Sequence, residues 1–283
     1  MKRLIVTDST ADLPDDIVRA LSIKVLPVNV VLDGKIYKDG VSITRDDFYA
    51  NFSRYSSMST EAVPYEDYAL EYLQMIQYYD EIIVIHCSSH LSETFNIACS
   101  VHQEFGDQTK CRVEIIDSGL CSMSMGMVVI AAAKALEQQK TMREVLAVIS
   151  DVKRGMKSYL AIPTLKYLKK NKKVSGFKSI FGLALGVKPV LEFNNGRMEI
   201  KTKLFGRQKN MILAMMDSIK RDIGSSAIDL SIIYSGDIEL VERLNDVFHT
   251  TFDCRDLYIA RFGPSIVINA GPESYAVFFS PHR

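Results

Sequence analysis

The residues of this chain that could do chemistry are mostly uncharged hydroxyls, and they gather beside segments with the composition of buried strands. Such side chains donate hydrogen bonds without adding charge, so they suit a carboxylate or a phosphate as ligand. Three clusters follow short apolar runs rich in Ile and Val, and a fourth precedes a predicted helix. The clusters are Ser9 and Thr10; Ser88, Ser89, Ser92 and Thr94; Ser118, Ser122 and Ser124; and Ser59 and Thr60.

These four clusters predict an anion site at one edge of a sheet. In an open parallel sheet, ligands bind in the crevice at the carboxyl ends of the strands, where helix N-termini present free N–H groups. The simpler interpretation of any single Ser or Thr is that it caps the helix or loop beside it. Several clusters that share one edge favour a binding site over capping alone.

Two catalytic alternatives involve the segment after the second apolar run. Ser92 is a nucleophile if His86 or His90 acts as its base, which would make the chain a serine-dependent hydrolase or acyltransferase. The segment Leu91–Thr94 lacks the glycines of a nucleophile elbow, and neither histidine has triad spacing. The two histidines and Glu93 form only a weak metal motif, because one histidine ends a strand and the other lies in a loop. We therefore expect no metal.

The charged residues do not favour a nucleic-acid partner. The chain has 34 basic and 34 acidic side chains in 283 residues, so its formal net charge is zero. Six lysines between Lys166 and Lys178 form either a solvated helix end and loop or a docking surface for an acidic partner or a phosphorylated product. Asp8 and Asp117 end strands, where capping of loop N–H groups is a simpler role than acid–base catalysis.

Alternating strands and helices in the first half must position the hydroxyl clusters. The alternation predicts a parallel sheet with helices on both faces, an α/β/α domain over residues 1–155. Ile82–Ile85 reads as a strand buried on both faces, and 23–32 as an edge strand because it contains a proline. Thr141 and Glu144 have the spacing of a capping box that opens a helix.

The second half has a different pattern. A β-hairpin is predicted over 187–203, with its turn at Asn195-Gly196, and helices and further strands follow it. This order predicts an α+β domain with a mixed sheet over residues 156–283. The whole chain is thus expected to be an α/β protein of two domains, an α/β/α domain with a parallel sheet followed by an α+β domain with a mixed sheet.

The remaining composition predicts a cytoplasmic protein. The longest apolar run, 127–133, is far shorter than the roughly 18 residues that a membrane span needs. The amino-terminal residues become acidic too soon for a signal peptide. Five cysteines without a CxxC pair are expected to be buried free thiols.

At these same residues the chain resembles the DegV family of bacterial fatty-acid-binding proteins. The resemblance spans nearly the whole length, and it rests on several short motifs that occur in the family's order. The motifs are Val6–Pro14; Ser88–Asn96, which is similar to S-S-x-L-S-G-T-Y-N; Ile116–Ser118 with Gly126; Leu165–Ser175; Lys188-Pro189; and Asn195-Gly196.

The resemblance implies a fatty acid whose chain is buried between or beneath two domains. It places the family's carboxylate-binding Thr and Ser on Thr60 and Ser92, and the family's histidine near the C-terminus on Asn269. Ser59, Ser89, Thr94 and Lys173 are expected to have secondary roles at the head group.

The resemblance also implies how such a chain works. Family members present the carboxylate to a separate ATP-binding fatty acid kinase subunit, which makes an acyl phosphate. The chain is therefore expected to be a carrier and not an enzyme, to need no cofactor, and to be a monomer. The alternatives are the serine-dependent enzyme and a diverged binder of another small anionic lipid.

Several positions depart from the family pattern, and five of them bear on the ligand or the partner. Glu93 replaces the glycine of the L-S-G-T motif, Lys173 an arginine, Phe205 another arginine, Asn269 the histidine and Glu273 a glycine. An amide still donates a hydrogen bond, and a lysine keeps the positive charge without the planar fork. Glu93 would repel a carboxylate ligand unless its side chain points away or is protonated. The departures bear on head-group geometry and on partner use.

Overall fold

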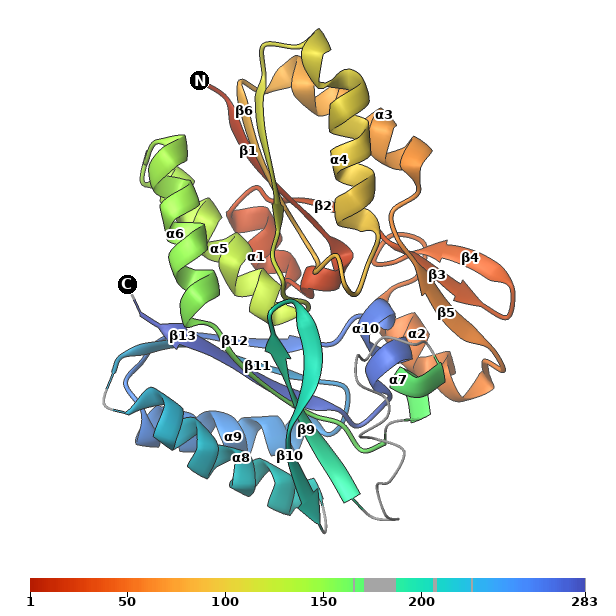
Figure 1. The fold of residues 1–283 in the computed structure, drawn as a ribbon. Helices are drawn as coiled ribbons and strands as arrows, with labels where there is room; N and C mark the ends of the chain where they lie inside the picture. The colour runs from red at the N-terminus through yellow and green to blue at the C-terminus, as the bar shows by residue number, and fades with distance from the viewer. Residues whose placement is uncertain (165, 171–186, 206–207, 225, 283) are drawn as a thin grey trace. The chain divides into compact units, whose positions relative to one another are not determined.

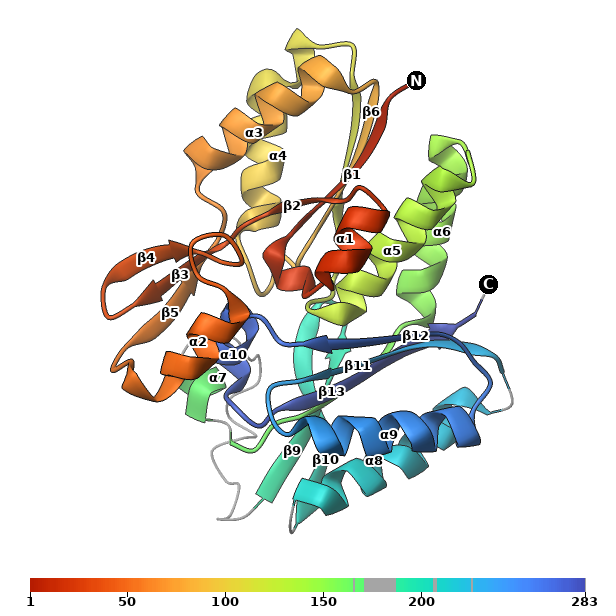
Figure 2. The same cartoon turned by 180° about the vertical axis from the view of Figure 1, so that it is seen from behind.

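The structure is a computed structural model that describes residues 1–164, 166–170, 187–205, 208–224 and 226–282 (Figures 1 and 2). The chain forms two compact units. Unit 1 comprises Met1–Arg154 with Gly263–Ser265, and unit 2 comprises Gly155–Phe262 with Ile266–Arg283.

A four-stranded parallel sheet in the order β2-β1-β6-β7 forms the centre of unit 1. Helices α3 and α4 cover one face of this sheet, and α5 and α6 cover the other (Figures 1 and 2). The α/β/α fold predicted from the alternation of elements is therefore confirmed. The elements are β1 (Arg3–Asp8), α1 (Asp15–Ala20), β2 (Lys24–Leu26), α3 (Tyr65–Tyr78), β6 (Glu81–His86), α4 (Thr94–Phe105), β7 (Arg112–Asp117), α5 (Met123–Glu137) and α6 (Met142–Gly155).

The burial of the central strands follows from their composition. Ile82–Ile85 in β6 are almost fully buried, because both faces of the strand pack against helices. One face contacts Tyr68, Tyr72 and Met75 of α3 in a single apolar cluster. The single edge strand predicted over 23–32 is only partly correct: β2 lies at the edge of this sheet, but the chain breaks at Pro27 and the rest of the segment forms the central strand of a second sheet.

A second, antiparallel sheet in unit 1 has the order β4-β3-β5 and was not predicted. Its third strand is polar, with the sequence Met-Ser-Thr-Glu, so it lacks the apolar alternation that identifies a strand. This strand places Thr60 opposite Val30 of β3. The elements are β3 (Asn29–Leu32), β4 (Lys35–Lys38), α2 (Arg45–Asn51) and β5 (Met58–Glu61).

Unit 2 contains a six-stranded sheet in the order β10-β9-β8-β13-β11-β12. The β11–β12 pair is parallel and the other pairs are antiparallel, so the predicted mixed sheet is confirmed. Helices α8 and α9 pack on one face and bury Ile219, Val241 and Phe248 against the strands. The elements are β8 (Lys157–Ala161), α7 (Lys166–Lys170), β9 (Val187–Asn194), β10 (Arg197–Phe205), α8 (Gln208–Ile223), β11 (Ile228–Tyr234), α9 (Ile238–Thr251), β12 (Cys254–Arg261), α10 (Pro264–Ala270) and β13 (Tyr275–Pro281).

Two local sequence signals are also confirmed. The hairpin β9–β10 turns at Asn195 and Gly196, which both have positive φ angles, of 48° and 79°. At the start of α6, the Glu144 carboxylate accepts from the Thr141 N–H at 2.7 Å, and Thr141 Oγ1 accepts from the Glu144 N–H at 3.4 Å. These reciprocal bonds are those of a capping box.

The cysteines only partly match their prediction. All five are free, and Cys87 and Cys121 are buried. Cys99 on α4 is exposed, so the prediction of burial is wrong for it, because this position lies on the solvent side of an amphipathic helix. Within the described ranges, no helix is both long and apolar enough to cross a membrane.

Candidate functional site

Most hydroxyls of the predicted clusters are bound to the protein itself. Ser118 Oγ donates to the Leu120 carbonyl at 3.2 Å, and Ser124 Oγ donates to the Cys121 carbonyl at 2.5 Å. Ser89 Oγ donates to the Asp117 carboxylate at 2.6 Å. The bonds of Ser118 and Ser124 are local, as the capping interpretation predicts, whereas that of Ser89 joins two strands, and in each case the hydroxyl proton is used within the protein.

The loop between β6 and α4 places Ser92 at the N-terminus of α4. The loop is fixed by a turn in which the Leu91 and Ser92 N–H groups donate to the Ser88 carbonyl, at 2.8 and 3.0 Å. Ser92 Oγ accepts from the Thr94 N–H at 3.3 Å and lies 3.0 Å from Thr94 Oγ1. Ser92 is half-buried and Thr94 is fully buried. A hydroxyl here lies beside the free N–H groups of a helix start, where an anion is favoured.

A hydrogen bond connects this loop to the segment that follows Thr60. The Val63 N–H donates to Thr94 Oγ1 at 3.4 Å, so the backbone three residues after Thr60 contacts the hydroxyl pair. Thr60 is half-buried in β5, whereas its neighbour Ser59 is exposed. Both Thr60 and Ser92 belong to unit 1.

Glu93, the residue that replaces the family's glycine, is exposed. Its carboxylate accepts from the Asn96 amide Nδ2 at 2.8 Å, on the outside of α4. The half-buried Ser92 and the exposed Glu93 therefore differ in surroundings although they are adjacent. The Glu93 carboxylate points to solvent. We expected it to repel a carboxylate ligand unless it points away or is protonated, and the first of these conditions is met.

The remaining residues that the resemblance places at or near the head group lie in the second half of the chain. Asn269 is half-buried in α10 and belongs to unit 2. Lys173 lies outside the described residues, as do Lys172 and Lys178 of the lysine run. For Phe205, the structure describes the backbone as the last residue of β10.

His86 is occupied by a buried network and is not available to Ser92. Its Nδ1 lies 2.8 Å from the Asp8 carboxylate and its Nε2 lies 2.9 Å from the Tyr68 hydroxyl, and all three side chains are fully buried. Burial raises the pKa of Asp8, but the hydrogen bond and charge of His86 and the Thr10 hydroxyl outweigh it, so the pKa lies below its ordinary value. The ionised carboxylate accepts from Nδ1–H.

The pKa of Tyr68 determines which group donates to the second ring nitrogen of His86. Burial, together with the charge of Asp8, raises the pKa of the Tyr68 phenol, so its hydroxyl stays protonated and donates to Nε2. With both ring nitrogens used, His86 serves neither as a general base nor as a metal ligand. His90 is exposed. Among the residues that the structure describes, no group of three His, Cys, Asp or Glu could hold a metal ion.

A buried acidic cluster after β1 was not predicted. The Asp12 carboxylate accepts from Ser122 Oγ at 2.6 Å and from the Gly263 N–H at 2.7 Å. Burial raises the pKa of Asp12 to about 7, although the charge of Arg45 and these hydrogen bonds lower it. Burial likewise raises the pKa of Asp39, against hydrogen bonds from Ser265 and Ser9 and the charge of Arg45. The cluster joins residues far apart in the sequence, so no local motif announces it.

Comparisons with known proteins point to one family. A family model described as "Uncharacterised protein, DegV family" matches residues 2–282. A DegV domain-containing protein of Caldanaerobacter subterraneus subsp. tengcongensis is 28% identical over 281 residues, which cover 98% of each chain.

Solved structures of similar proteins extend this finding. A structure described as fatty acid binding of a DegV family protein from Thermus thermophilus matches with a TM-score of 0.91 and 28% identity over 100% of both chains. A DegV lipid binding protein from Thermotoga maritima matches with a TM-score of 0.86 and 25% identity over 99% of both chains.

Proposed function

Because the chain belongs to the DegV family, we propose that it binds a long-chain fatty acid and holds the carboxylate with Thr60 and Ser92. The fatty-acid-binding relative from Thermus thermophilus, similar over its full length, supports the ligand class. The observation on this chain that carries the head-group assignment is the hydrogen-bonded path from Val63 through Thr94 to Ser92.

This path supports an assignment of the hydroxyl proton that is left for the ligand. Thr94 Oγ1 accepts from the Val63 N–H, and in this proposal the Thr94 hydroxyl is the donor in its hydrogen bond with Ser92 Oγ. Ser92 Oγ then accepts from the Thr94 hydroxyl and the Thr94 N–H, and its remaining hydrogen is a donor to a carboxylate. The donor is oriented before the ligand arrives, and the N-terminus of α4 adds a favourable dipole.

The acyl chain supplies most of the gross affinity in this proposal. Each buried methylene contributes about 0.8 kcal/mol, so a long chain outweighs the few hydrogen bonds at its head. The hydroxyls of Thr60 and Ser92 then select a carboxylate by neutral hydrogen-bond donors. Such a neutral site suits a carrier, because the carboxylate keeps its charge and its reactivity.

The proposal extends to how the carrier is used. The chain presents the carboxylate to a separate ATP-dependent fatty acid kinase subunit, and it acts as a cytoplasmic monomer without a cofactor. The His86 network supports a carrier over the serine-dependent enzyme, because His86, one of the two histidines considered as a base for Ser92, is already bound on both nitrogens.

Substitution of Ser92 tests the head-group assignment. In delipidated protein, Ser92→Ala should weaken palmitate binding by about tenfold, since a hydrogen bond to a charged group contributes about 1.5–3 kcal/mol. Calorimetric titration measures this change. Ser100→Ala is the matched control, because Ser100 lies on the exposed side of the same helix and donates only to the Asn96 carbonyl.

The same titration with methyl palmitate separates the head group from the acyl chain. The ester carries no charge, so Ser92→Ala should change its affinity much less than that of palmitate. Equal palmitate affinity in the wild type and Ser92→Ala would remove Ser92 from the site. Mass spectrometry of lipid released from the denatured wild type identifies the bound anion, and recovery of a different anionic lipid would overturn the ligand class.

A further inference from the structure

A three-residue segment of unit 1 interrupts the chain of unit 2. Unit 2 runs from Gly155 to Phe262 and resumes at Ile266, whereas Gly263–Ser265 belong to unit 1. We call these three residues the crossing segment. They join the end of β12 to the start of α10, so the way in which unit 1 holds them fixes the beginning of that helix.

Two buried carboxylates of unit 1 hold the crossing segment. Asp12 accepts from the Gly263 N–H at 2.7 Å, and Asp39 accepts from the Ser265 N–H. Asp12 is fully buried and Asp39 is 4% exposed. Pro264 has no N–H, so both N–H groups of the crossing segment donate to a carboxylate. The bond to Asp39 also satisfies one of the N–H groups that the first turn of a helix leaves without an intrahelical partner.

The crossing segment brings the two carboxylates close together. A Cβ atom at Gly263 would lie 2.9 Å from Asp12 Oδ1 and 3.8 Å from Asp39 Oδ2. It would lie 3.9 Å from Arg45 Nε, and the Arg45 guanidinium also donates to the Leu13 carbonyl at 3.2 Å. When both carboxylates are ionised, two negative charges share one guanidinium in a buried place. Such an arrangement is costly, and one bound proton makes it neutral.

The groups that face the two carboxylates come from several elements. Arg45 lies on α2, Ser9 follows β1 and donates to Asp39 at 3.2 Å, and Ser122 precedes α5 and donates to Asp12 at 2.6 Å. Of the charges, Arg45 lowers the pKa of both carboxyls, and Asp39 raises the pKa of Asp12.

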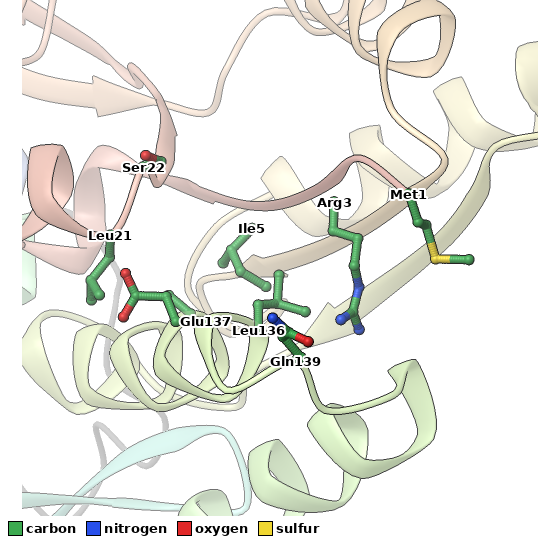
Figure 3. Close-up of a pocket in the computed structure, with 9 residues that line it drawn as sticks. Met1, Arg3, Ile5, Leu21, Ser22, Leu136, Glu137 and Gln139 are labelled. Carbon is green, nitrogen blue, oxygen red and sulfur yellow. The ribbon is translucent and has the colours of Figure 1, made fainter.

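The cluster is also separate from the hollow of about 540 Å³ that Figure 3 shows in unit 1. That hollow lies between the start of β1, the residues after α1 and the end of α5, and none of the residues of the cluster lines it. Water in this hollow therefore does not relieve the burial of Asp12.

We propose that the crossing segment is a pH-sensitive latch, which is closed while the pair Asp12 and Asp39 holds a proton and opens when that proton leaves. In the closed state, burial raises the pKa of Asp12 to about 7, against 3.8 for an ordinary aspartate. When the segment leaves, water reaches the carboxylates and the proton is released more readily. Between pH 4 and 7 the open state therefore binds fewer protons than the closed state, so rising pH favours opening.

Amide hydrogen exchange tests the latch. The exchange rates of the Gly263 and Ser265 amides are measured by NMR at pH 5, 6 and 7. The ratio of the intrinsic rate to the measured rate at each pH is the protection factor, which reports the ratio of closed to open molecules. Protection of both amides should fall by at least about tenfold between pH 5 and 7, since one linked proton changes this ratio by up to about tenfold per pH unit. The Val84 amide in β6 should be more protected at every pH, because it opens only when unit 1 unfolds.

Variants identify the groups that hold the proton. Asp12→Asn should remove most of the pH dependence of protection, because asparagine cannot ionise. Asp39→Asn removes the like charge that raises the pKa of Asp12, so the fall in protection should be smaller than in the wild type, and this variant serves if Asp12→Asn does not fold. Asp16→Asn, at an exposed position on α1, is the matched control and should show the pH dependence of the wild type.

Two results would overturn the latch. Equal protection of the crossing segment and Val84 would mean that the segment opens only with unit 1 as a whole. Protection that does not fall between pH 5 and 7, or that falls equally in the wild type and in the Asp12 and Asp39 variants, would exclude the two carboxylates as its control. The measurement uses no fatty acid, so failure of the proposed function leaves this test unchanged.

Discussion

At the scale of single residues, buried polar groups in unit 1 are satisfied by specific partners. Asp8, His86 and Tyr68 form a chain of hydrogen bonds in a fully buried environment. In such surroundings a satisfied network fixes the side chains, whereas removing one member leaves a neighbour without a partner. The network therefore has a structural role, and it also prevents His86 from activating Ser92.

Removing the Tyr68 hydroxyl tests that structural role. Tyr68→Phe should lower the free energy of unfolding by about 1–3 kcal/mol, because Nε2 of His86 is left buried without a donor. Palmitate affinity should not change. Tyr78→Phe is the control, since Tyr78 is 61% exposed, and it should unfold like the wild type in urea. Equal unfolding free energies for both variants would contradict the network.

The family resemblance singles out Thr60 and Ser92, and their role at the carboxylate stays a prediction, whereas the sequence pattern alone does not rank the hydroxyls. The sequence places hydroxyls next to strands but does not tell which proton is used internally. Ser89 is bound to Asp117 across two strands, and that pairing depends on the register of β6 and β7. Hydrogen-bond partners distant in the sequence decide which hydroxyls remain available.

At the scale of elements, periodicity and end signals predicted most of the fold. The β6 strand, the capping box before α6 and the β9–β10 hairpin each have a local physical cause that is visible in the sequence. The strand β5 has no such cause, because its polar residues are held by pairing with β3 and not by an apolar face. Thr60 was therefore predicted to precede a helix, and the strand that contains it was not predicted.

The link between the segment after β5 and the start of α4 also belongs to this scale, and it predicts the behaviour of Thr94→Val. This change keeps the shape but removes the acceptor of the Val63 N–H and the proposed donor to Ser92 Oγ. It should lower the free energy of unfolding by about 1–3 kcal/mol and weaken palmitate binding by several-fold.

A helix cap elsewhere in unit 1 provides the control for that variant. Thr141→Ala removes the cap of α6, which costs about 1 kcal/mol of stability without touching the loop at Ser92. Calorimetric titration and urea unfolding of both variants separate affinity from stability. If Thr94→Val loses stability but keeps full palmitate affinity, the proposed orientation of the Ser92 proton is wrong.

At the scale of the whole molecule, the acidic cluster shows what a linear reading of the sequence misses. Asp12, Asp39, Ser122 and Gly263 come from four separate parts of the chain and meet in unit 1. Motifs and periodicity act over a few residues, so they give no signal for a group assembled by tertiary contacts. Two like charges close together in a buried place are costly unless one is protonated, and this gives the cluster a pH dependence.

The pH dependence of stability has a definite sign. Asp12 has a pKa of about 7 in the folded chain, against 3.8 for an ordinary aspartate. Between these values the folded state holds a proton that the unfolded state has released, so this group stabilises the fold below pH 4 and the stabilisation is lost as the pH rises to 7. The free energy of unfolding should therefore fall by up to about 1.4 kcal/mol per pH unit relative to Asp12→Asn.

Urea unfolding of the wild type and Asp12→Asn at pH 5, 6 and 7 measures this difference. Asparagine adopts the positive φ of 55° at this position readily, and it cannot ionise, so the variant keeps the backbone and removes the titration. All other titratable groups are common to the two proteins, so their contributions cancel in the difference. Parallel curves for the two proteins would show that Asp12 is already ionised at pH 5. In that case Arg45 and the two hydrogen bonds outweigh burial, and the cluster contributes a permanent ion pair to unit 1.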